Sequence, residues 1–308
     1  MEVFLASCIV AGTPLLFATL GEIITEKSGS LNLGVEGMML MGAVIGFLTA
    51  AATNSALLAV LGAIAAGAAG ALIFAILTAS LNANQNVVGL TLTIFGTGFA
   101  GFLGQPVLGT SVPAEVYKSL KNFDIPLLKD IPFVGPVFFR HDVLVYVGYI
   151  VIIGFAFYMY KTRIGLNMRA VGENTAAADA SGINVTLYKY VHIIIGGALA
   201  GLGGAYLSLV RVPVWQSDIV NGRGWIAVAL VIFASWNPIK SFFGAVLFGG
   251  LGILGMKLQA MGFSISQYLV DMIPYVATII IVIISTHKRK KESQPPHDLS
   301  VPYFREER

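Results

Sequence analysis

Long apolar runs are the feature that most limits how this chain can fold. Crossing a hydrocarbon core of about 30 Å takes about 20 helical residues. Only 11% of the residues are charged, against roughly 25% in ordinary soluble domains. The pattern predicts an all-α polytopic membrane protein. Its eight membrane-length runs cover residues 3–20, 31–52, 56–81, 87–103, 143–160, 188–210, 242–258 and 268–285.

A ninth apolar segment, residues 225–236, is shorter. It either forms a half-helix or continues through its ends at a tilt. Counting it predicts about nine transmembrane helices, within a range of eight to ten, and nine crossings put the termini on opposite sides. Lysine and arginine concentrate on the cytoplasmic side of membrane proteins. With the N-terminus outside and the C-terminus cytoplasmic, twelve of the 19 basic residues lie inside, so this orientation is favoured.

The predicted organisation is one transmembrane domain, residues 1–286, followed by a basic cytoplasmic tail, residues 287–308. Residues 105–142 form a long extracytoplasmic loop in which five prolines alternate with short apolar pieces and lysines. Connections of this length are usually functional or disordered, and the apolar content predicts an ordered cap. Residues 293–308 are expected to be a solvated tail.

Small and polar residues within the apolar runs indicate close helix packing. Gly197 and Gly201 stand four residues apart, a spacing that lets helix backbones approach closely in lipid. Cys8 is the single cysteine, so no internal disulfide can form, and we interpret it as a packed thiol in the first span. The net charge of +3 is modest and gives no indication of nucleic-acid binding.

The polar, alanine-rich stretch 162–185 lies between two apolar runs, on the cytoplasmic side. Asn174 is a good N-cap, because its side-chain oxygen can accept a hydrogen bond from an unpaired amide of the first turn. Gly182 can close the helix in the left-handed conformation. The roughly eight residues between them predict a rod of about 12 Å. A rod of this size can fit a groove on another protein.

Two polar residues accompany the second apolar run. Asn32 and Glu36 are expected on a helix that enters the membrane near Leu31. An ionisable group at the membrane centre is costly and normally faces protein or water. Glu36 is therefore either a gate or pathway residue, or an interfacial residue that bonds a neighbouring loop and fixes the helix orientation.

Two further polar clusters leave alternatives open. Asn84, Gln85 and Asn86 could bind a neutral polar solute or could cap helices. Asn221 and Trp225 belong to a glycine-rich turn at the expected outer boundary, where Trp225 is an interfacial anchor or a stacking platform. In the last span, Asp271 either pairs with Lys257 or faces a cavity.

Several catalytic and nucleotide-binding motifs are absent. There is no phosphate-binding Walker A loop, no His-Glu-x-x-His zinc motif and no nucleophile elbow. The four histidines are too scattered to suggest a metal site. No catalytic residue or metal ligand is therefore predicted, and ATP, if used, would have to be bound by a partner.

Four motifs occupy residues 28–40, 84–90, 169–174 with 182–185, and 222–227 with 236–238. Together they resemble those of ABC importer permeases of the branch that handles ribose-type sugars, branched-chain amino acids and nucleosides. The motif at residues 28–40 is most similar to that of permeases in nucleoside systems served by lipoproteins of the basic membrane protein type. One departure is Asn86: it stands between Gln85 and the valine pair, which are adjacent in the family pattern.

The resemblance implies a non-catalytic permease subunit in a bacterial plasma membrane. Its partners would be an ABC ATPase subunit that holds ATP and magnesium, a second permease in a heterodimer, and an extracytoplasmic substrate-binding lipoprotein. The cytoplasmic stretch would be the coupling helix that docks on the ATPase. By position in the motif, its coupling residues would be Arg169, Gly172, Glu173, Asn174, Ala178 and Gly182.

Nucleosides are the expected substrates, translocated by alternating access, and simple sugars or branched-chain amino acids are the alternatives within the family. A proton-coupled secondary transporter using Glu36 or Asp271 is the alternative from a different class, and a membrane enzyme is a third. The candidate pathway residues are Asn32, Glu36, Asn84, Gln85, Asn86, Asn221 and Trp225.

Overall fold

The computed structural model describes residues 2–121, 123–125, 128–262, 266, 269, 272–273, 275–280, 283 and 294–304. Seven helices in these ranges are long and apolar enough to cross a membrane. The predicted eighth run, residues 268–285, lies largely outside the described residues, so the helix count stays a prediction. The seven are α1 (Glu2–Lys27), α2 (Val35–Thr53), α3 (Ala56–Ala75), α4 (Gln85–Gly104), α7 (Val143–Lys161), α10 (Val185–Tyr206) and α12 (Pro238–Ala260).

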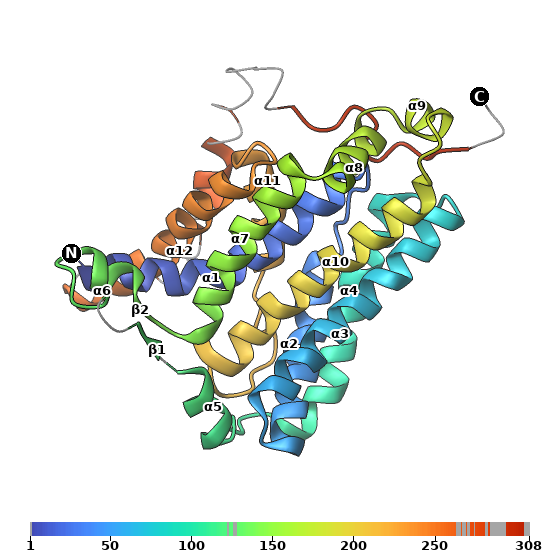
Figure 1. Cartoon of the computed structure of the whole chain (residues 1–308). Coiled ribbons are helices and arrows are strands. Elements are labelled where there is room, and N and C mark those ends of the chain that lie inside the picture. The colour runs from blue at the N-terminus through green and yellow to red at the C-terminus, as the bar shows by residue number, and fades with distance from the viewer. Residues whose placement is uncertain are drawn as a thin grey trace.

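The helices form a bundle with α1, α2 and α10 at its centre, and α3 packs along α2 and α10 (Figure 1). Single π-helical turns, η1 (Ile76–Ser80) and η3 (Leu207–Arg211), extend α3 and α10. The N-terminus and residues 294–304 lie at opposite ends of the bundle (Figure 1). The end that carries residues 294–304 also carries α8 (Arg163–Glu173) and α9 (Thr175–Ala180), the two helices of the predicted cytoplasmic stretch.

Glycines bring the central helices into backbone contact. A Cβ atom added to Gly42 would lie 2.4 Å from the Cα atom of Gly201, and one added to Gly67 would lie 2.2 Å from the Gly197 carbonyl oxygen. Neither separation is sterically allowed, so α2, α3 and α10 can pack this closely only with glycine at these positions. The predicted packing role of Gly197 and Gly201 is confirmed.

This packing predicts a stability effect for the Gly201→Ala substitution. Its new methyl group would meet the carbonyl oxygen of Ala63 at 2.4 Å. Overpacking of this kind typically costs about 1–3 kcal/mol, so we expect the melting temperature of the purified protein to fall by several degrees. Gly98→Ala is the matched control, since a Cβ there meets nothing within 4 Å. Equal melting of G201A and wild type in tryptophan fluorescence scans would contradict the close contact.

Helix α1 is longer than the apolar run that predicts it. It continues to Lys27, so Glu22 and Glu26, which lie beyond the predicted run 3–20, are part of the helix. Both side chains are buried. The Glu22 carboxylate accepts a hydrogen bond from the backbone amide of Asn32 at 2.9 Å, and Glu26 accepts one from the Trp236 indole. Because both acidic side chains accept a hydrogen bond, the helix can continue with these polar groups inside the protein.

The predicted outer loop is ordered over the residues that the structure describes. It contains the 3₁₀ turn η2 (Gln105–Val107), α5 (Ala114–Leu120), α6 (Val134–Phe138) and the two-stranded sheet β1 (Phe123–Asp124) with β2 (Arg140–His141). A single antiparallel bridge joins Ser111 to Val214 in the segment after η3. The expectation of an ordered cap is confirmed for this part of the chain.

The short ninth segment forms α11 (Arg223–Phe233), a helix of eleven residues. Such a helix is about 16 Å long, roughly half of a hydrocarbon core. It runs beside the second half of α1. The Thr19 hydroxyl donates a hydrogen bond to the Ala227 carbonyl oxygen at 3.4 Å, and the Trp236 indole, just after α11, donates one to Glu26. The first half of α1 contacts α12 instead, through Gly12 and Ala245. Of the two alternatives, the half-helix is the one observed.

Candidate functional site

Residues 162–185 form two helices, α8 and α9, where one was predicted. The Thr162 hydroxyl accepts a hydrogen bond from the Gly165 amide at 3.0 Å and so starts α8. Asn174 separates the helices and caps α9 by accepting a hydrogen bond from the Ala177 amide at 2.8 Å. Gly182 follows α9 with φ of +82°, the left-handed conformation. Both predicted caps are confirmed, while α9 has six residues instead of about eight.

The outward side of this two-helix element carries three of the residues assigned to coupling. Glu173, Asn174 and Gly182 are exposed, together with the small side chains of Ala176 and Ala177. Glu173 is the last residue of α8 and lies next to the sharp bend between the helices. Around the bend between the two helices, this side therefore presents the Glu173 charge beside small residues.

The other three assigned residues support the element from within. A Cβ on Gly172 would lie 2.4 Å from the carbonyl oxygen of Lys27, so α8 is held directly against the end of α1. Ala178 is buried with Val171, so its side chain is not exposed to a partner. The Arg169 guanidinium lies 5.5 Å from the ring centroid of Tyr160. These residues fix the position of α8 and α9 on the bundle.

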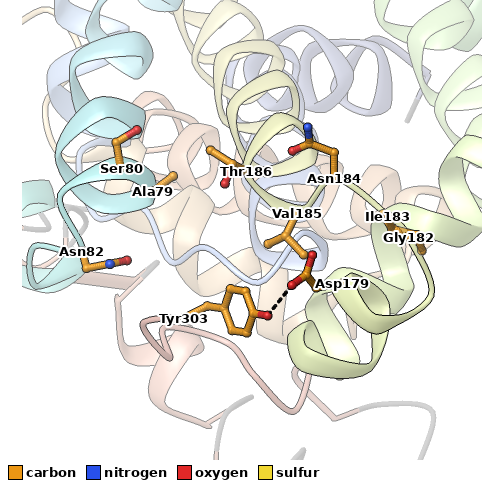
Figure 2. A pocket seen from close by; sticks show the side chains of 10 residues that line it. All are labelled: Ala79, Ser80, Asn82, Asp179, Gly182, Ile183, Asn184, Val185, Thr186 and Tyr303. Atoms are coloured by element: carbon orange, nitrogen blue, oxygen red, sulfur yellow. Dashed lines mark hydrogen bonds between the residues drawn. The ribbon is translucent and has the colours of Figure 1, made fainter. Parts of the chain in front are cut away.

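The C-terminal segment, residues 294–304, packs against the same element. The expectation of a solvated tail is therefore wrong for these residues. The carboxylate of Asp298 accepts a hydrogen bond from the Thr175 amide at 2.8 Å. The Tyr303 hydroxyl donates to Asp179 at 2.7 Å, as Figure 2 shows. Specific hydrogen bonds hold this polar segment in place, and amino-acid composition does not reveal such bonds.

The charge of Asp298 is stabilised by its contacts. Burial tends to raise the pKa of Asp298, yet hydrogen bonds from the Thr175 amide and the His297 ring hold that pKa below its ordinary value. Because this pKa is lowered, the stability that the ionised carboxylate contributes is fully present at any pH above the ordinary aspartate pKa. It is lost only as the pH falls through the lowered pKa. At neutral pH the contact to α9 is therefore made by an ionised group.

A cavity of about 620 Å³ opens beside α9 (Figure 2). Ser80 and Asn82 line it from the end of η1, and Asn184 lines it from the start of α10. Tyr303 of the C-terminal segment completes the wall opposite α10. The lining is mainly polar, so this end of the bundle presents a hollow of hydrogen-bonding groups next to the candidate coupling surface.

A second candidate site lies where α2 meets the start of α11. The two carboxylate oxygens of Glu36 accept hydrogen bonds from the backbone amides of Gly222 and Gly224, at 2.8 and 2.6 Å. Asn221 and Gly222 both have positive φ, 49° and 77°, which turns these amides toward the carboxylate. The first amides of a helix have no partner within the helix. Glu36 supplies one, so its bond to a neighbouring loop is observed, while a role of Glu36 in the substrate pathway stays a prediction.

The turn 221–225 lies deeper than the sequence suggested. A Cβ on Gly224 would meet the Glu36 backbone at 2.5 Å, which puts the start of α11 level with the first turn of α2. The expected position of Asn221 and Trp225 at the outer boundary is therefore wrong. The chain reaches this depth through residues 212–222, which leave the outer bridge at Val214 and run back into the bundle. Trp225 is 37% exposed.

The remaining pathway candidates act as local hydrogen-bonding groups. Asn32 lies in the loop before α2 and not on a helix, and its side-chain oxygen accepts a hydrogen bond from the Gly34 amide at 2.9 Å. Asn84 caps α4 by accepting hydrogen bonds from the amides of residues 86 and 87. Gln85 is buried and accepts from the Leu31 amide at 2.7 Å, while Asn86 is exposed.

The amide cluster and Glu36 lie at different depths. Gly37, next to Glu36, contacts Gly96 of α4. Gly96 is eleven residues beyond Gln85, which is about 16 Å along a helix. The structure therefore brings Glu36 together with residues 221–225, and brings Gln85 to the loop before α2, but does not gather all seven candidates into one site.

Sequence reasoning missed four groups that hold these sites together. Glu22 and Glu26 are four residues apart, and this i, i+4 spacing on one helix face was a usable signal. Asp298 and Tyr303 gave no comparable signal, since their partners lie more than a hundred positions away.

Two other predictions concern Cys8 and Asp271. Cys8 is buried, as predicted. Asp271 lies outside the described residues, so its pairing stays a prediction. Lys257, its proposed partner, lies 4.3 Å from the ring centroid of Phe4.

Among the described residues, no group of three or more histidine, cysteine, aspartate or glutamate side chains could hold a metal ion.

Comparison with known proteins identifies the family. The profile of the branched-chain amino acid transport system permease component matches residues 4–283. The chain belongs to this permease family. Its members are membrane components of ABC transporters, so the protein is an ABC transporter permease in the plasma membrane. The apolar helices described above are its transmembrane segments.

Individual relatives differ in the substrates that their names give. A chain of Haloferax volcanii, assigned provisionally as a glucose ABC transporter permease, is 40% identical over 85% of this chain and 79% of the relative. The nucleoside ABC transporter permease of Lactococcus lactis is 32% identical over 92% of each chain. The guanosine ABC transporter permease of Bacillus subtilis is 33% identical over 91% of each chain. The chain is thus similar to both sugar and nucleoside permeases.

Proposed function

We propose that this permease is the translocation subunit of an ATP-driven importer of nucleosides, and that α8 and α9 dock on its ATPase. The observation that supports the coupling role is that this two-helix element is attached on one side and exposed on the other. Its inner side is fixed to α1 through Gly172, and its outer side presents Glu173 and small residues. An element that is exposed on one side and rigidly attached on the other can pass a push from a partner to the membrane helices.

The proposed orientation places the N-terminus outside and residues 294–304 in the cytoplasm. Support comes from the basic residues, most of which then lie inside, and from the position of the C-terminal segment beside α8 and α9. The proposed partners are the ATPase, which holds ATP and magnesium, a second permease in a heterodimer, and an external substrate-binding lipoprotein.

The nucleoside assignment rests on the first sequence motif and on the two nucleoside-transporting relatives. The sugar permease at 40% identity supports the alternative of a simple sugar, and the family name includes branched-chain amino acids. The geometry of Glu36 does not favour a proton-coupled transporter, because both carboxylate oxygens are engaged by backbone amides.

Competition uptake separates these substrates. In vesicles that contain the assembled transporter and ATP, unlabelled nucleosides should suppress the uptake of labelled guanosine, while glucose and leucine should not. Uptake should require ATP and survive collapse of the proton gradient, since ATP hydrolysis is the proposed energy source. Glucose uptake that nucleosides do not affect would replace the nucleoside assignment with a sugar. Uptake that continues without ATP would contradict an ABC mechanism.

A further inference from the structure

The C-terminal segment, residues 294–304, connects parts of the bundle that are far from it in the sequence: the loop after α1, and helices α8, α9 and α10. Its main chain donates a hydrogen bond from the Asp298 amide to the Gly172 carbonyl oxygen of α8 at 3.0 Å. Two residues later, the Ser300 amide donates to the carbonyl oxygen of Gly29, in the loop after α1, at 3.2 Å. The segment thus lies across the junction between α1 and α8, where Gly29 and Gly172 also bring their backbones together.

Side chains from the same segment hold both ends of α9. Asp298 accepts the hydrogen bond from Thr175, the first residue of α9, and Tyr303 donates to Asp179 near its last residue. Tyr303 also packs against the buried cluster that contains Val171 and Ala178. A helix of six residues is too short to be stable on its own. The position of α9 therefore depends on groups outside it, and two of them come from the C-terminal segment.

A charge interaction connects the segment to α10 as well. Lys189, in the first turns of α10, is buried, and Asp298 is the acidic group whose charge acts on it. Asp298 thereby contacts or attracts groups on α8, α9 and α10. The face of the segment that carries Val301 is different, since that side chain is 48% exposed.

We propose that the C-terminal segment is a strap that fixes α9 to the bundle, with Asp298 and Tyr303 as positioning residues for energy coupling. The inference rests on the proposed function of α8 and α9. A push on an α9 held only by its flanking loops would be absorbed by movement of α9 itself. With the strap in place, the same push is transmitted to α1 and α10.

The first test measures the strap without any partner. Asp298→Ala removes the acceptor for Thr175, and Tyr303→Phe keeps the ring but removes the donor to Asp179. Hydrogen exchange on the purified full-length permease should become about five- to tenfold faster for amides 175–182 in both variants, as expected when one such hydrogen bond is lost. Val301→Ala, an exposed position in the same segment, should leave exchange unchanged. Unchanged exchange in both test variants would overturn the strap.

The second test measures coupling in the assembled transporter with its ATPase. Both variants should bind the ATPase normally but import at least about twofold less substrate per ATP hydrolysed, while V301A matches wild type. Faster exchange with an unchanged ratio of uptake to ATP hydrolysis would overturn the positioning role. If the proposed docking role of α8 and α9 is wrong, a different result is expected. The Glu173→Arg variant would then bind the ATPase like wild type, whatever the exchange rates of the α9 amides.

Discussion

Reversal of charge in the Glu173→Arg variant is expected to abolish uptake and ATPase association while leaving membrane insertion and folding intact. Glu173 is exposed at the end of α8, where substitutions away from packed groups usually change stability by less than about 0.5 kcal/mol. A charge reversed at a complementary interface, by contrast, costs several kcal/mol through repulsion and lost pairing. Co-purification with the ATPase and uptake in vesicles are the measurements.

Two controls separate docking from other effects of the substitution. Glu115→Arg makes the same change at an exposed position in α5, at the opposite end of the bundle, and should be silent. Glu173→Gln removes the charge without reversing it. It is expected to retain part of the activity, because a neutral side chain introduces no repulsion at the interface. The part that is lost includes the attraction between Glu173 and Lys27 of α1. A well-folded E173R variant that binds the ATPase like wild type would show that this residue does not belong to the coupling surface.

Loss of the Glu36 carboxylate is the second large effect that we expect. In Glu36→Ala, the amides of Gly222 and Gly224 both lose their acceptor, and Glu36 is only 5% exposed. An unsatisfied buried donor costs about 1–3 kcal/mol, so the turn before α11 should loosen, and uptake and melting temperature should both fall markedly. In Glu36→Gln, one side-chain oxygen remains as an acceptor, and the losses should be smaller.

The order of the two variants is the informative result. Melting and uptake should decrease together from wild type through E36Q to E36A, since one and then two amides lose an acceptor. Glu115→Gln, on the exposed surface, is the matched control for removal of a carboxylate. Normal melting and uptake in E36A would mean that Glu36 does not hold α11. Loss of uptake with unchanged melting in E36Q would indicate a direct pathway role instead.

The elements that were predicted well are those whose cause is local. Asn174 and Gly182 were identified as the caps of a helix because a cap acts on amides within a few positions of it. The packing role of Gly197 and Gly201 followed from their spacing within one apolar run. The apolar runs themselves located the seven long helices that the structure describes, although the last two turns of α1 were missed because Glu22 and Glu26 end the run.

The elements that were predicted poorly depend on partners far away in the chain. Trp225 was expected at the outer boundary, where aromatic residues often act as anchors, yet residues 212–222 lead the chain back to the depth of Glu36. The C-terminal segment looked solvated because it is polar and contains prolines. Its hydrogen bonds to α8 and α9 supply the stability that its composition does not. Ala178 looked like part of a docking face, but Tyr303 and Val171 cover it.

By itself, the sequence determined that the chain is an all-helical membrane protein, that its motifs resemble those of ABC permeases, and that a capped helix begins at Asn174. Length, hydropathy and capping suffice for this, because they act between neighbours. Only the tertiary structure decided that Glu36 holds the start of α11, across 186 positions, and that Asp298 holds the start of α9, across 123. A carboxylate accepts hydrogen bonds from whichever backbone amides the fold brings next to it. Because these amides lie far away in the chain, no local sequence pattern predicts the pairing.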